Sequence, residues 1–147
     1  MTTAQTTILH VEDDPNDAML FQHACRKAEV TFRLNSVKDG DEAIACLRGV
    51  ENFADRDRYP FPELVLLDLK MPRVSGFDVL SWIRHEEPMK RVPVIVLTSS
   101  SHETDIQRAY DLGANSYLVK PVGFDALVDV VKTIQGYWMQ FNEGVPR

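Results

Sequence analysis

The chain has 147 residues and a formal net charge of −6, with 44% hydrophobic and 26% charged residues. This length and composition predict one globular domain with its own core. The acidic balance argues against broad binding to nucleic acid or to anionic membranes, and no apolar run approaches the roughly 20 residues of a membrane-spanning helix.

Two further features bear on the compartment. The N-terminal residues lack the basic and apolar regions of a signal peptide. Cys25 and Cys46 lie in helical patterns without a CxxC spacing, so we expect reduced thiols in the core. Both features favour a cytoplasmic protein.

Apolar runs and helical stripes alternate along the chain. We expect strands at residues 6–12, 32–37, 64–68, 93–97 and 115–119. We expect helices at 15–29, around 43–47 with an end near Gly49, around 79–83, at 103–112 and at 124–134. Asp14 before Pro15 predicts the N-cap of the first helix.

The alternation of five strands with five helices predicts the fold class. We expect an α/β fold with a flavodoxin-like, doubly wound, five-stranded parallel sheet in the strand order 2-1-3-4-5. We expect a single domain over 1–147, with a core at about 6–138 and a C-terminal tail at 139–147. Segment 50–63 carries charges, two prolines and three aromatics without a clear period. It is expected to be a long ordered loop, either a connector or a partner contact through Phe53, Tyr59 and Phe61.

Carboxylates stand at the ends of the first and third strands, which this order places side by side. Glu12, Asp13 and Asp68 should therefore share one crevice. Carboxylates that crowd together repel one another, and Mg²⁺ or Mn²⁺ relieves that repulsion. Asp13 and Asp68 are candidate direct ligands, with the backbone carbonyl of Lys70 as a third and Glu12 acting through water.

The other strand ends carry groups suited to a phosphoryl site. A carboxylate such as Asp68 is a competent phosphoryl acceptor. The Thr98 hydroxyl and the Lys120 ammonium could stabilise phosphoryl oxygens. Taken singly, these residues have plainer explanations: Asp68 as a turn former, Thr98 as part of a helix cap, and Lys120 as a solvated lysine.

Four sequence blocks, ILHVEDDP, LVLLDLKMPRVSG, VIVLTSS and SYLVKP, resemble the signature blocks of response-regulator receiver domains of two-component signalling. The resemblance covers about residues 6–135. It implies that Asp68 is the phosphoacceptor and that Glu12 and Asp13 are the acidic pair. By the same resemblance, Thr98 is the switch hydroxyl, Tyr117 the switch aromatic and Lys120 the site lysine. It also implies a cis peptide bond at Lys120–Pro121. Lys70 and Ser100 resemble residues that tune the rate of dephosphorylation; alternatively, they are simply solvent-exposed loop residues.

The long loop and the aromatic tail resemble single-domain regulators that partner bacterial phytochromes. The resemblance thus implies a stand-alone regulator that accepts a phosphoryl group from a sensor histidine kinase, of phytochrome type in the narrower match. The fourth helix, fifth strand and fifth helix would form the output face toward a downstream protein. DNA binding is not expected, since little chain follows the fifth helix. Near its end, Tyr137, Trp138 and Phe141 either cap the core or form a surface for a homodimer or another partner.

Two other functions remain open at this point. A Mg²⁺-dependent phosphohydrolase with an aspartyl-phosphate intermediate would also place a nucleophilic aspartate after an apolar strand. Such enzymes have a second acidic residue two positions after the nucleophile, where this chain has Lys70. A receiver-like module without phosphorylation is the third alternative. The full set of Asp13, Asp68, Thr98 and Lys120 speaks against it, and we expect a signalling protein rather than an enzyme.

Overall fold

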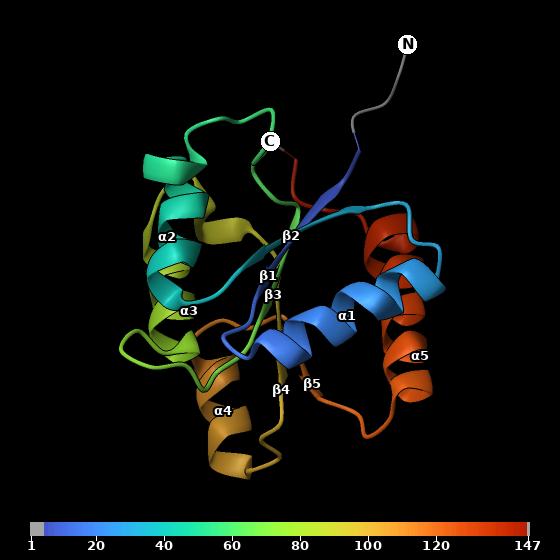
Figure 1. The fold of residues 1–147 in the computed structure, drawn as a ribbon. Coiled ribbons are helices and arrows are strands. Elements are labelled where there is room, and N and C mark those ends of the chain that lie inside the picture. Colours follow the sequence, from blue (N-terminus) through green and yellow to red (C-terminus); the bar gives the residue numbers. More distant parts are fainter. Residues whose placement is uncertain (1–4, 147) are drawn as a thin grey trace.

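The computed structural model describes residues 5–146, and its centre is a five-stranded parallel sheet (Figure 1). The strand order is β2-β1-β3-β4-β5, which confirms the predicted fold class. The strands are β1 (Thr7–Val11), β2 (Arg33–Val37), β3 (Leu64–Leu67), β4 (Val94–Thr98) and β5 (Ser116–Val119). Every residue of β1, β3 and β4 is buried, as expected for strands covered on both faces.

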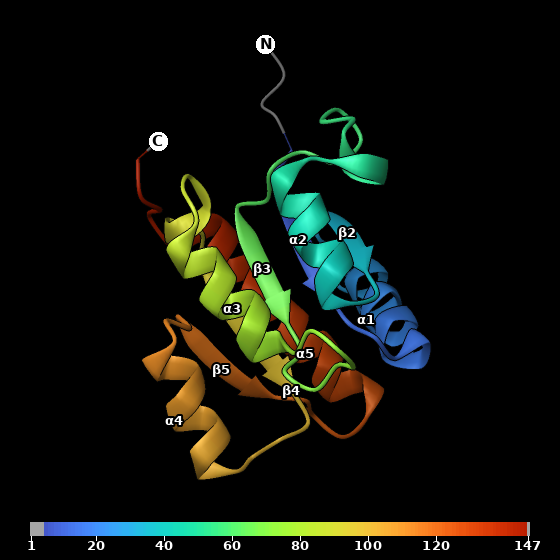
Figure 2. The ribbon, with the colours of Figure 1, turned by 90° about the vertical axis from the view of Figure 1, so that its left-hand side faces the viewer.

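Five α-helices cover the two faces of the sheet. They are α1 (Pro15–Lys27), α2 (Gly40–Arg48), α3 (Gly76–His85), α4 (Glu103–Asp111) and α5 (Phe124–Ile134). Helices α2, α3 and α4 lie on one face and α1 and α5 on the other, as the two views show (Figure 1, Figure 2). Each face has its own apolar cluster, one with α2 and α3 and one with α1 and α5. Helix α4 is the least embedded, because Ala109 alone among its residues is buried.

Side chains at the helix ends set the helix boundaries. Asp14 caps α1 as predicted, and its carboxylate accepts from the amides of Asn16 and Asp17. The first helix ends at Lys27 rather than Glu29, because Glu29 adopts a left-handed φ of 54°. Helix α2 begins at Gly40, earlier than its apolar stripe indicated, because the Asp39 side chain caps it.

Segment 50–63 is ordered and closes the C-terminal end of α2. Residues Glu51–Phe53 form a 3₁₀ turn. The Arg56 guanidinium donates to the carbonyls of Cys46 and Leu47, both at 2.8 Å. These are carbonyls that a helix end leaves without a helical partner. Phe53 is buried and lies edge-on to Tyr59, which packs against the α2–α3 cluster, so this part of the loop belongs to the core.

Helical structure continues beyond Ile134, where the sequence predicted the end of the fifth helix. Residues Gln135–Phe141 form a π-helical extension of α5. Trp138 packs against the α1–α5 cluster, whereas Tyr137 is 53% and Phe141 77% exposed. Trp138 therefore caps the core, and the other two form an exposed aromatic pair.

The expected cis peptide at Lys120–Pro121 is wrong. The cis bond among the described residues is Glu87–Pro88. The trans form of an X–Pro bond is favoured by only about 0.5–1 kcal/mol, so a Lys–Pro pair alone does not determine the isomer.

The core contains two cysteines and one histidine. Cys25 and Cys46 are buried and free, and burial raises the pKa of Cys25 to about 12 and of Cys46 to about 11. They are inert core thiols at neutral pH. His10 is buried on β1 with its ring centroid 4.4 Å from that of Phe21. Across residues 5–146, no helix is long and apolar enough to cross a membrane.

His10 should make the fold acid-sensitive. Burial, reinforced by the nearby Lys120 charge, lowers the pKa of His10 from 6.5 to about 4. Between pH 6.5 and about 4 the histidine takes up a proton in the unfolded chain but not in the folded one, so the free energy of unfolding falls progressively across this range and levels off below it. We expect His10→Leu to remove an acid-dependent loss of up to about 3 kcal/mol in the free energy of unfolding. Urea unfolding at pH 7 and pH 4 would measure it, with exposed His23→Leu as the control. Equal losses in wild type and His10→Leu would contradict this assignment.

Candidate functional site

The carboxyl ends of four strands meet at one edge of the sheet. The register pairs Val11 of β1 with Leu67 of β3, so that the next residues, Glu12 and Asp68, emerge side by side. The Lys120 amide donates to the Thr98 carbonyl at 2.7 Å, which holds the end of β5 against the end of β4. Residues far apart in the sequence are thereby brought to one place, as the parallel order predicts.

The start of α3 packs closely against the backbone at the end of β3. Gly76 begins α3 directly against the backbone of Asp68. A Cβ at this position would lie 2.1 Å from the Asp68 carbonyl oxygen, which no side chain could tolerate. Glycine at position 76 therefore lets α3 pack tightly behind the aspartate.

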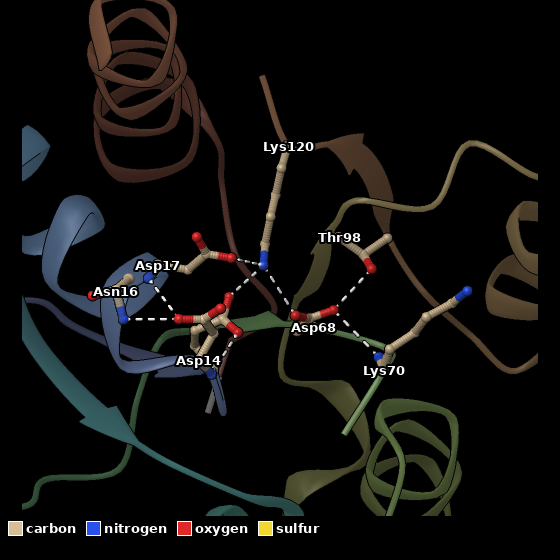
Figure 3. A network of polar contacts seen from close by, with 8 residues as sticks. Asp14, Asn16, Asp17, Asp68, Lys70, Thr98 and Lys120 are labelled. Carbon is tan, nitrogen blue, oxygen red and sulfur yellow. Dashed lines mark hydrogen bonds and ion pairs between the residues drawn. The ribbon is translucent and has the colours of Figure 1, made fainter. Parts of the chain in front are cut away.

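Three carboxylates form an acidic cluster at the edge. Oxygen atoms of Glu12, Asp13 and Asp68 all lie within 4.8 Å of one another. Glu12 is 3% and Asp68 7% exposed, and Asp13 is half-buried at the rim. Such an all-oxygen set fits a hard divalent cation. Lys70 contributes its backbone amide, which donates to Asp68 Oδ1 at 3.3 Å, while its side chain points away (Figure 3).

The Lys120 ammonium lies at the centre of the polar network (Figure 3). Its Nζ lies 2.6 Å from Glu12 Oε1, 2.8 Å from Asp17 Oδ2 and 3.0 Å from Asp68 Oδ2. The ammonium donates hydrogen bonds to Asp17 and Asp68, whereas its contact with the buried Glu12 Oε1 is an ion pair without hydrogen-bond geometry. The plainer explanation of a solvated lysine is wrong, since the side chain is only 19% exposed.

Burial and charge shift the pKa values of these groups in different directions. Burial raises the pKa of Glu12 to about 7, despite its contact with Lys120. Burial also acts to raise the pKa of Asp68, but hydrogen bonds from Thr98 and Lys120 outweigh it and keep the pKa below its usual value. For Lys120, contacts with Asp17, Glu12 and Asp68 outweigh burial and raise the pKa. Asp68 is thus an ionised carboxylate at neutral pH, beside a protonated lysine.

Thr98 and Tyr117 occupy different positions relative to Asp68. The fully buried Thr98 donates its hydroxyl to Asp68 Oδ1 at 2.8 Å. The half-buried Tyr117 donates its hydroxyl to the Ser100 carbonyl at 2.9 Å. Ser100 in turn donates its hydroxyl to Asp105 in the first turn of α4, at 2.6 Å. A chain of contacts therefore runs from β5 through the loop after β4 to α4.

Not every candidate lies at this edge. The structure brings together Glu12, Asp13, Asp68, Thr98, Lys120 and the backbone of Lys70. Tyr137, Trp138 and Phe141 belong to the extension of α5, outside the polar network. Ser100 is buried, so the alternative of an exposed loop residue is wrong for this position.

The residue that sequence reasoning missed is Asp17. An acidic residue in the first turn of a helix is ordinarily explained by the helix dipole alone, yet the Asp17 carboxylate contacts Lys120. A signal was present, because Asp17 stands four residues after Asp13, one helical turn along a helix that begins at the sheet edge.

The arrangement has a definite chemical capacity. Asp68 is a carboxylate nucleophile that carries a hydroxyl donor on one oxygen and an ammonium donor on the other. An acidic cluster that could hold a cation lies directly beside it. These are the groups that acceptance of a phosphoryl group requires.

Comparison with known proteins identifies the family. The model of the response regulator receiver domain matches residues 8–132. The chain is 40% identical over 135 residues to the probable methanogenesis regulatory protein FilR2 of Methanothrix harundinacea, covering 92% of this chain and 84% of FilR2. It is 35% identical over 133 residues to the response regulator Rcp1 of Synechocystis, covering 90% and 88% of the two chains.

Solved structures agree. The phosphorylated cyanobacterial phytochrome response regulator RcpA superimposes with a TM-score of 0.88 at 36% identity, over 97% of this chain and all of RcpA. The Mn²⁺-bound form of Rcp1 superimposes with a TM-score of 0.83 at 33% identity, over 96% and 99% of the two chains. The resemblance noted in the sequence is thereby confirmed, and this chain belongs to the response regulator receiver domain family.

Proposed function

We propose that this protein is a stand-alone response regulator, one receiver domain over 1–147, that accepts a phosphoryl group on Asp68 from a sensor histidine kinase. The observation that carries the proposal is the buried, ionised Asp68 carboxylate with Thr98 on one oxygen and Lys120 on the other. Family membership favours this function over a phosphohydrolase, and a complete set of phosphoryl-handling groups favours it over a module without phosphorylation.

The transfer step follows from the geometry. An oxygen of Asp68 attacks the phosphorus, the bond from phosphorus to the donor nitrogen breaks, and an acyl phosphate forms on Asp68. The Thr98 hydroxyl and the Lys120 ammonium already contact the acceptor and would donate to phosphoryl oxygens. The protein promotes its own phosphorylation and dephosphorylation and turns over no separate substrate.

The acidic cluster is the proposed cation site, for Mg²⁺ with Mn²⁺ as the alternative. Asp13, Asp68 and the Lys70 carbonyl would be ligands, and Glu12 would act through water. When bound, the cation neutralises charge on the transferring phosphoryl group. The oxygen-only donor set and the Mn²⁺-bound form of Rcp1 support this assignment.

The switch would run along the contacts from Thr98 to α4. A phosphoryl group adds roughly −1.5 to −2 charges at Asp68 and draws in the Thr98 hydroxyl. Tyr117 would then exchange its bond to the Ser100 carbonyl for an inward position, which would loosen the tie to α4. Output would pass through the face of α4, β5 and α5 to a downstream protein. Tyr110 and Val119 already expose apolar surface there.

The proposed input is a kinase of phytochrome type. RcpA is a phytochrome response regulator, and its match to this chain extends over all of RcpA. A kinase partner in turn implies a cytoplasmic location. We propose that the protein binds neither nucleic acid nor membranes.

We further propose a homodimer as one mode of assembly. Tyr137 and Phe141, four residues apart on the extension of α5, both expose aromatic surface. Exposed aromatic surface is typical of interfaces. Trp138 would support this surface from below rather than contact the partner.

Asp68→Asn should abolish phosphorylation, because an amide cannot form an acyl phosphate. Incubation with a small-molecule phosphodonor and Mg²⁺, followed by intact mass spectrometry, would show one acid-labile phosphoryl group on wild type and none on the variant. Exposed Asp129→Asn controls for the loss of a charge. Undiminished labelling of Asp68→Asn would show that the acceptor is another residue.

Beryllofluoride, a phosphoryl mimic, should shift the switch residues when added with Mg²⁺. We expect amide resonance changes at Thr98 and Tyr117, and none at Trp138, which lies outside the polar network. Asp68→Asn should show no such changes. If the amides of Thr98 and Tyr117 stay unmoved in wild type, the proposed switch is wrong.

Phe141→Ser should convert a dimer into a monomer in sedimentation velocity experiments if the aromatic pair forms the interface. Met19→Ser, which removes an exposed apolar side chain from α1, serves as the control and should remain dimeric. A monomeric wild type would remove the dimer from the proposal.

A further inference from the structure

Three carboxylates share the Lys120 ammonium, and one of them differs from the other two. Glu12 and Asp68 belong to the acidic cluster that could hold a cation. Asp17 lies outside that cluster and comes from the first turn of α1. Asp17 and Asp68 approach the ammonium from different sides (Figure 3).

Packing leaves open space beside the Lys120 side chain. A cavity of about 170 Å³ lies beside it, bordered by Glu12, Asp17 and Lys120 and by apolar residues such as Leu20 and Phe124. Lysine has a flexible four-carbon stem, so open space on one side gives the ammonium somewhere to move. Its position therefore depends on its ionic contacts.

The strength of two of these contacts changes during the proposed phosphorylation, on which this inference depends. A cation in the cluster competes with Lys120 for the charge of Glu12 and Asp68. Acyl phosphate formation then removes the free carboxylate of Asp68 altogether. Neither event involves Asp17, so the Asp17–Lys120 contact at 2.8 Å can persist throughout.

We propose that Asp17 is a positioning residue for Lys120. It retains one N–H of the ammonium on the α1 side and thereby keeps the remaining donors directed at Asp68 and its phosphoryl group. Without it, the ammonium could turn into the cavity or remain with Glu12.

The sign of the effect separates this role from two others. If Asp17 acted only as a nearby negative charge, its removal would favour binding of an anionic phosphoryl mimic. If it competed with the phosphoryl group for Lys120, its removal would also favour binding. A positioning role predicts the reverse.

The test is Asp17→Asn, which keeps the shape of the side chain and removes its charge. Asp125→Asn is the matched control, since Asp125 is the acidic residue in the first turn of α5 and is exposed. Beryllofluoride affinity would be measured at saturating Mg²⁺ for each protein. Because the Asp17 side chain is 41% exposed, we expect a weakening on the order of fivefold or less, with Asp125→Asn unchanged. Asp17→Glu should recover part of the loss.

A second readout needs no metal or phosphoryl mimic. The side-chain NH₃⁺ resonance of Lys120 should be visible by NMR in metal-free wild type, because hydrogen bonds to Asp17 and Asp68 and an ion pair with Glu12 hold the ammonium in place. It should broaden in Asp17→Asn and not in Asp125→Asn. Unchanged or tighter beryllofluoride binding by Asp17→Asn, with wild type responding normally, would overturn the positioning role alone. A wild type that neither binds beryllofluoride nor takes up phosphate would overturn the proposed function as well.

Discussion

The negative charge gathered at the carboxyl edge of the sheet is the constraint on which the rest of this structure depends. Glu12 and Asp68 are nearly inaccessible to water, and an uncompensated carboxylate in such a place is strongly disfavoured. One ammonium, that of Lys120, compensates them. It can do so only because β5 lies next to β4 and the chain leaves β5 directly above the acidic residues. Strand order, the glycine behind Asp68 and the position of α1 all serve to keep these few groups within reach of one another.

The compensation is also incomplete in a useful way. A lysine provides one positive charge for three neighbouring carboxylates, and burial together with the nearby Asp68 charge keeps the pKa of Glu12 raised despite that lysine. A site with surplus negative charge attracts a divalent cation, and a cation lowers the barrier that an incoming anionic phosphoryl group would otherwise meet. The same shortage of positive charge that is costly to the fold would therefore favour the proposed phosphoryl transfer.

Much of the fold and the site followed from the sequence, for identifiable reasons. Aliphatic strands such as Leu64–Leu67 have a clear signature, and a parallel order brings their ends together whatever the loops do. What the sequence did not reveal depends on helical phase and on contacts between distant segments. The pairing of Asp17 with Lys120 requires the rotation of α1 about its axis, and the anchoring of Arg56 on the end of α2 requires the path of an irregular loop. The extension of α5 was missed because Gly136 interrupts an otherwise helical pattern, and packing of Trp138 outweighs that local preference.

Helix α4 buries a single residue, Ala109, whereas α3 buries five. The apolar cluster beneath α4 is correspondingly small and draws mainly on Leu69, Phe77 and Val96. The stability of a protein is unevenly distributed, and elements with few buried contacts open at a lower free-energy cost than the global unfolding of the chain. Besides Ala109, α4 is held by the hydrogen bond from Ser100 to Asp105 and by the Arg108 guanidinium, which lies 4.1 Å from the centroid of the Phe77 ring. A rearrangement there needs little energy, so the proposed phosphorylation of Asp68 would reach the surface through α4 without disturbing the two larger clusters that keep the protein folded.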